Sequence, residues 1–327
     1  MSSASGRDRS RIADRLIDVF RKLLEVVDEL VDQFLRGLVV FLAIGPGTTW
    51  IEQFGVHARH FDRHFETEVR VLLESGVVDR DAVVDTSPGW MRLDQFTIRD
   101  FRNYGELDLA GILEKSSNIG MSRLALQLSD TAIWEKYHQL GLGQAPGTGF
   151  PGESTGSLPA PVRWSRSERA ALSYGYGLSV SAVQLASAYT ALANDGVRLP
   201  PSLLRLSEPP QGIPAISPTV ANDLLNILET SVAAYTGGRR ARVEGYRVGG
   251  KTGTVRKTGQ QGYTTDAYRS VFAGIAPISD PRIVTVVMID HPKAGEFYGG
   301  AVAAPVFSSV TGNALRLLDV PPDHEAE

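Results

Sequence analysis

The hydrophobic pattern changes its period near residue 246, and this change constrains the fold more than any other feature of the sequence. From about residue 61 to 240, apolar residues recur at three- and four-residue spacing, which predicts mainly helices. After the change, β-branched and aromatic runs predict three strands, over residues 246–255, 270–278 and 283–289. The last two are close enough to form a hairpin, and a final amphipathic helix is predicted over about 302–318. Helices followed by antiparallel strands indicate an α+β architecture.

Helix ends in the long helical stretch are marked by capping residues. Ser181 and Gln184 have the spacing of a capping box, and Gly196 is a typical stop signal for the helix that follows them. Ser217-Pro218 is an N-cap followed by proline in the first turn of another helix. The Gly/Pro/Ser-rich residues 141–161 are predicted to form an ordered surface loop.

Charge and cysteine content exclude several classes of function. The net charge is −4 and no Lys/Arg-rich stripe stands out, which argues against a nucleic-acid partner. The absence of cysteine excludes disulfides and thiolate chemistry. The N-terminus does not resemble a signal peptide, and the most apolar stretch, residues 38–44, is far shorter than the roughly 20 residues that a bilayer span requires.

The first 60 residues contain one amphipathic helical pattern. A core-facing or oligomerising helix is favoured over a membrane-surface helix, because its polar face mixes acidic and basic residues. The apolar stripe consists of Leu16, Phe20, Leu23, Val27, Leu30, Val31 and Phe34.

Two short motifs carry residues that could perform chemistry. The first is Ser116-Ser117-Asn118, and the second is Gly-Gly-Lys-Thr-Gly-Thr at residues 249–254, inside a predicted strand. A Ser-x-Asn triplet alone is weak, since it is expected by chance about once in a chain of this length. Lys-Thr-Gly alone could mark a turn or strand end, although glycine within a strand often marks the close approach of a ligand.

In this order, the two motifs resemble the later parts of the signature of serine transpeptidases and β-lactamases, Ser-x-x-Lys, Ser-x-Asn and Lys-Thr-Gly. From about residue 72 to 322 the chain is similar to the transpeptidase domain of class B penicillin-binding proteins, specifically the septal division transpeptidase. The collinear segments that carry this similarity are residues 97–100 (TIRD), 107–120, 141–153, 172–196, 267–277 and 299–307.

The resemblance implies a β-lactamase/transpeptidase-like fold, with an antiparallel central sheet flanked by helices and a helical subdomain. It also implies D-Ala-D-Ala peptide cross-linking in septal peptidoglycan, without a cofactor. Partners would be the peptidoglycan stem peptide, a β-lactam and divisome proteins.

Site residues can be carried over position by position. Ser116 would relay a proton to the departing amine, and Asn118 would bind the substrate amide. Lys251 would lend positive charge to the site and tune that serine.

The substrate carboxylate would bind to the hydroxyl groups of Thr252 and Thr254, on either side of Gly253, and the Thr254 N–H would supply half of an oxyanion hole. Tyr174 and Gly175 match a segment beside the site, where a structural role is as plausible as a contact role.

The nucleophile of the family is missing. No serine in the chain has lysine three positions later. Counting back from Ser75-Gly76, which matches the end of the family's active-site helix, places Asp62 at the serine position and Phe65 at the lysine position. Asp62 is a poor substitute, because acyl transfer to a carboxylate gives a reactive anhydride.

A metal site is not expected. His60 and His64 have the spacing of helical metal ligands and His57 lies nearby, but a solvated helix face is the favoured interpretation.

No strand alternation is visible in residues 1–60, so we expect the N-terminal strands of the family fold to be missing. The expected organisation is a non-matching helical segment (1–60), an incomplete transpeptidase domain (61–322) and a tail (323–327). This pattern suggests a foreign 5′ coding part, for example through a frameshift or an internal start.

Three functional interpretations remain open. The chain could be a transpeptidase-like protein that is catalytically impaired, a non-catalytic scaffold or peptide-binding pseudoenzyme, or a truncated or frameshifted product. The family works at the inner membrane facing the periplasm. Without a visible anchor or export signal, this chain is expected to be cytoplasmic as written.

Overall fold

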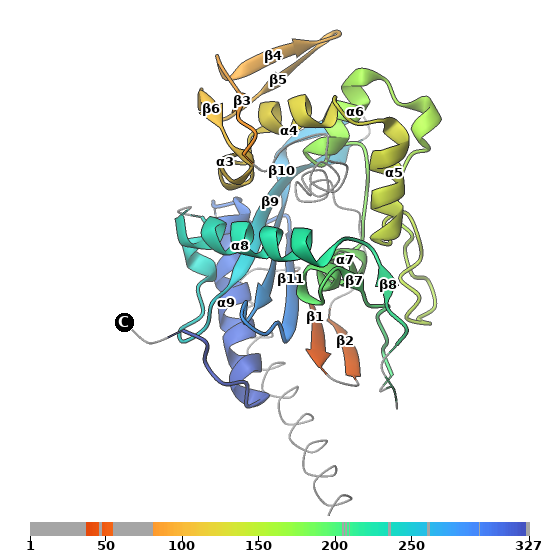
Figure 1. Ribbon diagram of the computed structural model, residues 1–327, viewed down its shortest axis with the longest axis vertical. Coiled ribbons are helices and arrows are strands. Elements are labelled where there is room, and N and C mark those ends of the chain that lie inside the picture. The colour runs from red at the N-terminus through yellow and green to blue at the C-terminus, as the bar shows by residue number, and fades with distance from the viewer. Residues whose placement is uncertain are drawn as a thin grey trace, which may run out of the picture.

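A five-stranded antiparallel sheet forms the centre of the molecule (Figure 1). The computed structural model describes residues 37–45, 48–54 and 81–324, apart from 205, 207, 209, 235–236, 260–261 and 294. The sheet has the order β2-β1-β11-β10-β9, so β9 lies at one edge. Its strands are β1 (Gly37–Gly45), β2 (Thr48–Phe54), β9 (Gly249–Gly259), β10 (Gly262–Ala276) and β11 (Ile283–Asp290). The α+β class and the β10–β11 hairpin are confirmed.

The expectation that the N-terminal strands are missing is wrong. β1 pairs with β11, from Gly37 opposite Ile289 to Ala43 opposite Ile283, and β2 returns beside β1. The apolar run 38–44 is too short for a bilayer but has the length of a buried strand, and a wholly apolar strand shows no alternation. The sheet therefore takes strands from both sides of the domain boundary expected at residue 60.

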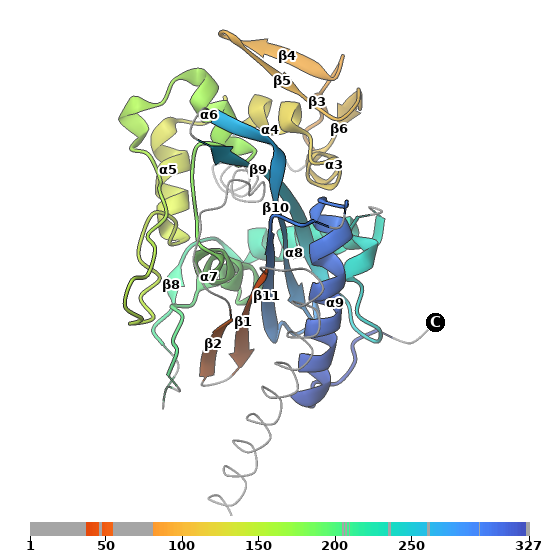
Figure 2. The same cartoon turned by 180° about the vertical axis from the view of Figure 1, so that it is seen from behind.

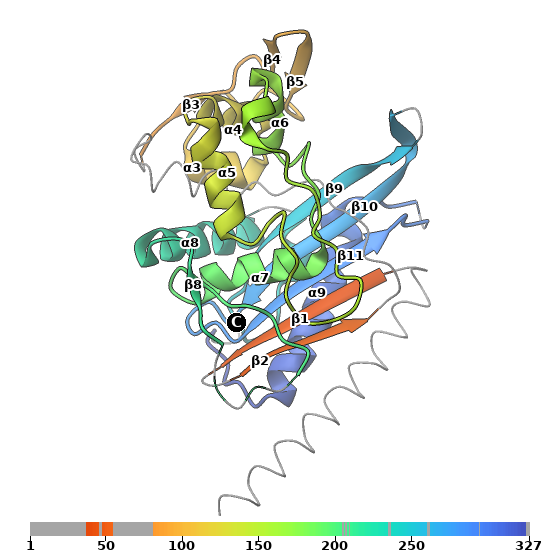
Figure 3. The same cartoon turned by 90° about the vertical axis from the view of Figure 1, so that its right-hand side faces the viewer.

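Helices cover both faces of the sheet (Figure 3). α7 (Ala182–Ala193) and α8 (Pro218–Ala234) pack on one face, and α9 (Gly299–Leu317) packs on the other, where the reverse view in Figure 2 shows it beside β10 and β11. The side chains of β10 alternate accordingly. Val271 and Ala273 join the core under α7 and α8, whereas Phe272 packs on Phe307 of α9 with ring centroids 4.6 Å apart.

A helical subdomain lies beyond one end of the sheet, with the β4–β5 hairpin at its tip (Figure 1). Its elements are β3 (Val84–Asp85), β4 (Trp90–Leu93), β5 (Phe96–Arg99), β6 (Glu106–Leu107), α3 (Leu109–Lys115), α4 (Asn118–Ala125), α5 (Asp130–Gln139), the 3-10 helix η1 (Pro161–Arg163) and α6 (Arg166–Ser173). The remaining elements are β7 (Val197–Arg198), β8 (Ile213–Pro214) and the 3-10 helix η2 (Arg239–Ala241). No helix in the described part of the chain has the length and apolar character that crossing a membrane requires.

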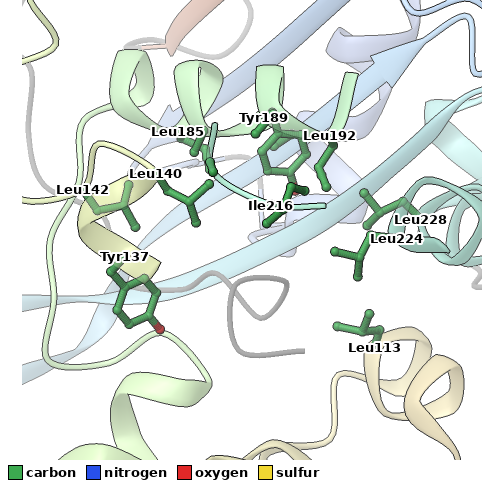
Figure 4. Close-up of a cluster of buried hydrophobic side chains, with 14 of the residues drawn as sticks. Leu113, Tyr137, Leu140, Leu142, Leu185, Tyr189, Leu192, Ile216, Leu224 and Leu228 are labelled. Atoms are coloured by element: carbon green, nitrogen blue, oxygen red, sulfur yellow. The ribbon is translucent and has the colours of Figure 1, made fainter. Parts of the chain in front are cut away.

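One hydrophobic core joins the subdomain to the sheet. Figure 4 shows Leu113 of α3 and Tyr137 of α5 in the same cluster as Leu185 of α7 and Leu224 of α8. Tyr137 is fully buried, and its hydroxyl donates to the Leu172 carbonyl at 3.1 Å. The position of α3, which carries one of the two motifs at its end, is therefore set by packing against α8.

The predicted helix ends are confirmed. Ser181 and Gln184 form a capping box at the start of α7, and the Gly196 N–H bonds back to that helix at the Ala191 carbonyl. α8 begins at Pro218, with the Ser217 hydroxyl accepting from the backbone of its first turn. The loop over residues 141–161 is anchored by a backbone bridge from Ser157.

A cluster of charges connects three strands at one end of the sheet and makes stability depend on pH. Asp290 on β11 accepts from Lys257 on β9 at 3.0 Å and from Arg269 on β10 at 3.2 Å. Burial alone would raise the pKa of Asp290, but the hydrogen bonds and charges of these two cations together outweigh it and hold the pKa below its usual value.

We expect Asp290→Asn to lower the free energy of unfolding near neutral pH and to flatten its pH dependence in acid. A carboxyl group with a depressed pKa stabilises the fold above its unfolded pKa of about 4, and this contribution is lost as the pH falls through the folded pKa. Urea unfolding of both proteins from neutral pH to below about pH 4 measures the difference. Parallel curves for the two proteins would contradict the assignment.

Candidate active site

Ser116 lies on the connector between α3 and α4, in a left-handed conformation with φ 52° and ψ 50°. For a residue other than glycine this conformation costs roughly 1 kcal/mol, so the surroundings must hold it in place. The Ser116 N–H donates to the Leu113 carbonyl at 3.2 Å and the Ser117 N–H donates to Ile112 at 3.0 Å, which closes the end of α3. Ser117 then caps α4, its hydroxyl accepting from the Gly120 N–H at 2.9 Å.

Lys251 on β9 reaches the Ser116 side chain. Its Nζ donates to Ser116 Oγ at 2.5 Å, and the lysine is only 9% exposed. Lys251 lies opposite Ala273 of β10, which places it on the sheet face covered by α7 and α8, and α3 packs on α8 from the same side. The two motifs, far apart in the sequence, thus meet through one hydrogen bond. An ammonium group beside a hydroxyl favours proton transfer through that hydroxyl.

The residues that follow Ser116 in the connector are bound to the end of β5. Ser117 Oγ donates to Asp100 Oδ2 at 2.6 Å, and the Ile119 N–H donates to Asp100 Oδ1 at 3.1 Å. Burial raises the pKa of Asp100, although these hydrogen bonds partly oppose the shift. The Asn118 amide donates to the Arg99 carbonyl at 2.7 Å, so one of its two N–H groups is engaged within the protein.

Thr252 and Thr254 lie on the opposite face of β9 from Lys251. They are paired with Phe272 and Ser270 of β10, on the α9 side. Thr254 Oγ1 accepts from the Gly299 N–H at the start of α9 at 2.9 Å, which leaves its hydroxyl proton available to donate. Among the strands that the structure describes, β9 is at the edge of the sheet, so one side of its backbone lies outside their ladder.

Aromatic residues next to Thr254 were not identified from the sequence. Tyr298 directly precedes the glycine that binds Thr254, is 55% exposed, and packs at 4.5 Å against Phe297. Phe297 stacks on Tyr268 of β10 with ring centroids 4.1 Å apart. In the sequence, this group of aromatic residues is marked by the glycine pair that follows Phe297-Tyr298 and begins a helix.

Tyr174 and Gly175 lie at the end of α6. Tyr174 packs against the core and meets Tyr176 edge to face at 5.6 Å, while Gly175 has a φ of 87°. These contacts give the segment a structural role, and its contact role stays a prediction.

The expected nucleophile positions, Asp62 and Phe65, lie outside the described residues, as does the histidine group at positions 57, 60 and 64. In the described part of the chain, no three His, Cys, Asp or Glu residues are grouped as a metal site would require.

Comparisons with known proteins identify the family of this chain. A family model described as "Penicillin binding protein transpeptidase domain" matches residues 69–312. The chain is 44% identical over 252 residues to the "Probable peptidoglycan D,D-transpeptidase PbpC" of Pseudomonas aeruginosa, covering 77% of this chain and 45% of that protein. It is 39% identical over 255 residues to "Peptidoglycan D,D-transpeptidase FtsI" of Escherichia coli, covering 78% and 43%. The chain therefore spans less than half the length of these two relatives.

The fold is also shared with a solved structure. The transpeptidase domain of penicillin-binding protein 3 from Burkholderia pseudomallei superposes with a TM-score of 0.85 at 36% identity, covering 97% of each chain. The similarity extends over the sheet and the helical subdomain together.

Proposed function

This chain belongs to the penicillin-binding-protein transpeptidase domains, and we propose that it binds the D-Ala-D-Ala end of peptidoglycan stem peptides without forming an acyl-enzyme. Septal wall synthesis, β-lactam binding and divisome partners are part of this proposal. The curated relatives named above are D,D-transpeptidases, which is the source of the substrate class.

The observation that carries the proposal is the 2.5 Å contact between Lys251 Nζ and Ser116 Oγ. A cationic group, a hydroxyl and two threonine hydroxyls on an edge strand are suited to a peptide that ends in a carboxylate. The outer side of β9 offers backbone hydrogen bonds to an extended peptide, and Lys251 provides positive charge.

We expect no acyl-enzyme because of the chemistry that a serine nucleophile requires. A serine hydroxyl attacks a carbonyl only when a neighbouring base removes its proton. The sequence has no Ser-x-x-Lys pair, and Lys251 beside Ser116 donates a hydrogen bond to the hydroxyl instead of accepting its proton. Ser116 and Lys251 would still hold a proton near the leaving amine, but no bond to the carbonyl carbon would be formed. Binding and acylation are therefore expected to separate.

Fluorescent penicillin and a labelled D-Ala-D-Ala peptide test the two halves of the proposal. We expect the peptide to bind reversibly, as measured by fluorescence anisotropy. No penicillin band should survive denaturing electrophoresis. An active penicillin-binding protein in the same gel controls for the dye.

Peptide binding and the absence of acylation can each be contradicted separately. A covalent band would show that another residue acts as nucleophile, and mass spectrometry of the labelled peptide would identify it. A folded protein that binds no D-Ala-D-Ala peptide would overturn the binding function.

A further inference from the structure

Asp100 binds the residues of the Ser-Ser-Asn connector that follow Ser116, whereas Lys251 binds Ser116 itself. Its two carboxylate oxygens accept from the Ser117 hydroxyl and from the backbone N–H groups of Asn118 and Ile119. The neighbouring Arg99 carbonyl accepts from Asn118. The end of β5 therefore fixes three successive residues that follow Ser116.

The arrangement requires an acceptor at both oxygens. Ser117 is fully buried, and its oxygen already accepts from Gly120, so its proton is directed to Asp100. The Ile119 N–H is a backbone donor at the start of α4, where no helical carbonyl is available. An ionised carboxylate serves both donors, whereas an asparagine amide serves one and presents a donor to the other.

Ser116 itself depends on this binding. Its left-handed backbone is unfavourable, and the hydrogen bonds at the end of α3 hold it through the N–H groups of Ser116 and Ser117 alone. On its C-terminal side, Ser117 is held by Asp100.

We propose that Asp100 is a positioning residue, which holds Ser116 Oγ within hydrogen-bond distance of Lys251 by fixing the connector. This proposal rests on the proposed roles of Ser116 and Lys251. Asp100 binds Ser117 and Ile119, and it is expected to act on Ser116 through Ser117.

NMR of the full chain with ¹³C-labelled lysine tests this directly. The Lys251 side-chain signal is assigned by its loss in Lys251→Met, and Ser116→Ala gives its position when the hydroxyl is absent. We expect Asp100→Asn to move the signal toward the Ser116→Ala position and to weaken D-Ala-D-Ala peptide binding about tenfold, equivalent to about 1.4 kcal/mol.

The double variant separates positioning from a direct charge effect. Asp100→Asn removes a negative charge, and this electrostatic change would persist when Ser116 is alanine. Positioning predicts instead that Asp100→Asn causes no further shift in the Ser116→Ala background. An unchanged Lys251 signal in Asp100→Asn, or the same shift in both backgrounds, would overturn the proposal.

Two further variants control for a general loss of stability. Thr285→Val removes a buried hydrogen bond to Thr311 on the far face of the sheet, so it should lower stability and leave the Lys251 signal unchanged. If Asp100→Asn does not fold, Ser117→Gly removes the same donor while keeping an acceptable N-cap, and the same shift is expected. If the wild type binds no peptide, the proposed function fails, while the Lys251 signal still decides the role of Asp100.

Discussion

Lys251→Met is expected to weaken binding of a D-Ala-D-Ala peptide by about ten- to a hundredfold. A hydrogen bond to a charged group contributes about 1.5–3 kcal/mol, and methionine keeps the length of the side chain while removing the charge. Because Lys251 is 9% exposed and sits on Ser116, its charge acts where water screens it little. Isothermal titration of the purified protein with the peptide measures the change.

Lys257→Met is the matched control. Lys257 lies on the same strand and the same face, and its removal changes the net charge equally, but its side chain binds Asp290 at 3.0 Å. Peptide affinity should remain within about twofold, although the free energy of unfolding should fall. Equal loss of affinity in both variants would mean that overall charge, rather than the contact with Ser116, attracts the peptide.

The sequence was sufficient to predict the residues of this pair but not the groups that hold them. Ser-x-Asn and Lys-Thr-Gly are local patterns of residue type, so similarity to a family locates them. Gly299 acts through its backbone N–H, and the Asp100 carboxylate accepts from the Ile119 N–H as well as from the Ser117 hydroxyl. Backbone contacts impose little pattern on the sequence, and only the folded chain brings them together.

The elements of the fold that were predicted also differ from those that were missed in how locally the sequence marks them. Capping residues and alternating strands leave signals within a few positions, which is why α7 and the β10–β11 hairpin were predicted. β1 is wholly apolar and pairs with β11 at the far end of the chain. Neither its period nor its neighbours in the sequence revealed a strand.

Gly299→Ala is expected to lower the free energy of unfolding by about 3 kcal/mol and to reduce peptide binding. A Cβ at this position would lie 2.4 Å from the carbonyl oxygens of both Gly253 and Val271. Both obstacles are backbone atoms of the sheet, so the strain can be relieved only by moving the start of α9 away from β9. That movement would break the hydrogen bond from the Gly299 N–H to Thr254.

Gly312→Ala on the same helix should have a much smaller effect on stability. Its added Cβ would meet only side-chain atoms, Val243 Cγ1 at 3.0 Å and Arg316 Nη1 at 3.6 Å, and alanine is favoured over glycine inside a helix by about 1 kcal/mol. Urea unfolding of both variants therefore compares one substitution in two surroundings. If both variants were stabilised, α9 would not begin against the Lys-Thr-Gly strand, and the arrangement of Thr254 would need another cause. Destabilisation confined to Gly299→Ala would mean that this glycine is required because the helix backbone contacts the strand that carries Thr252 and Thr254.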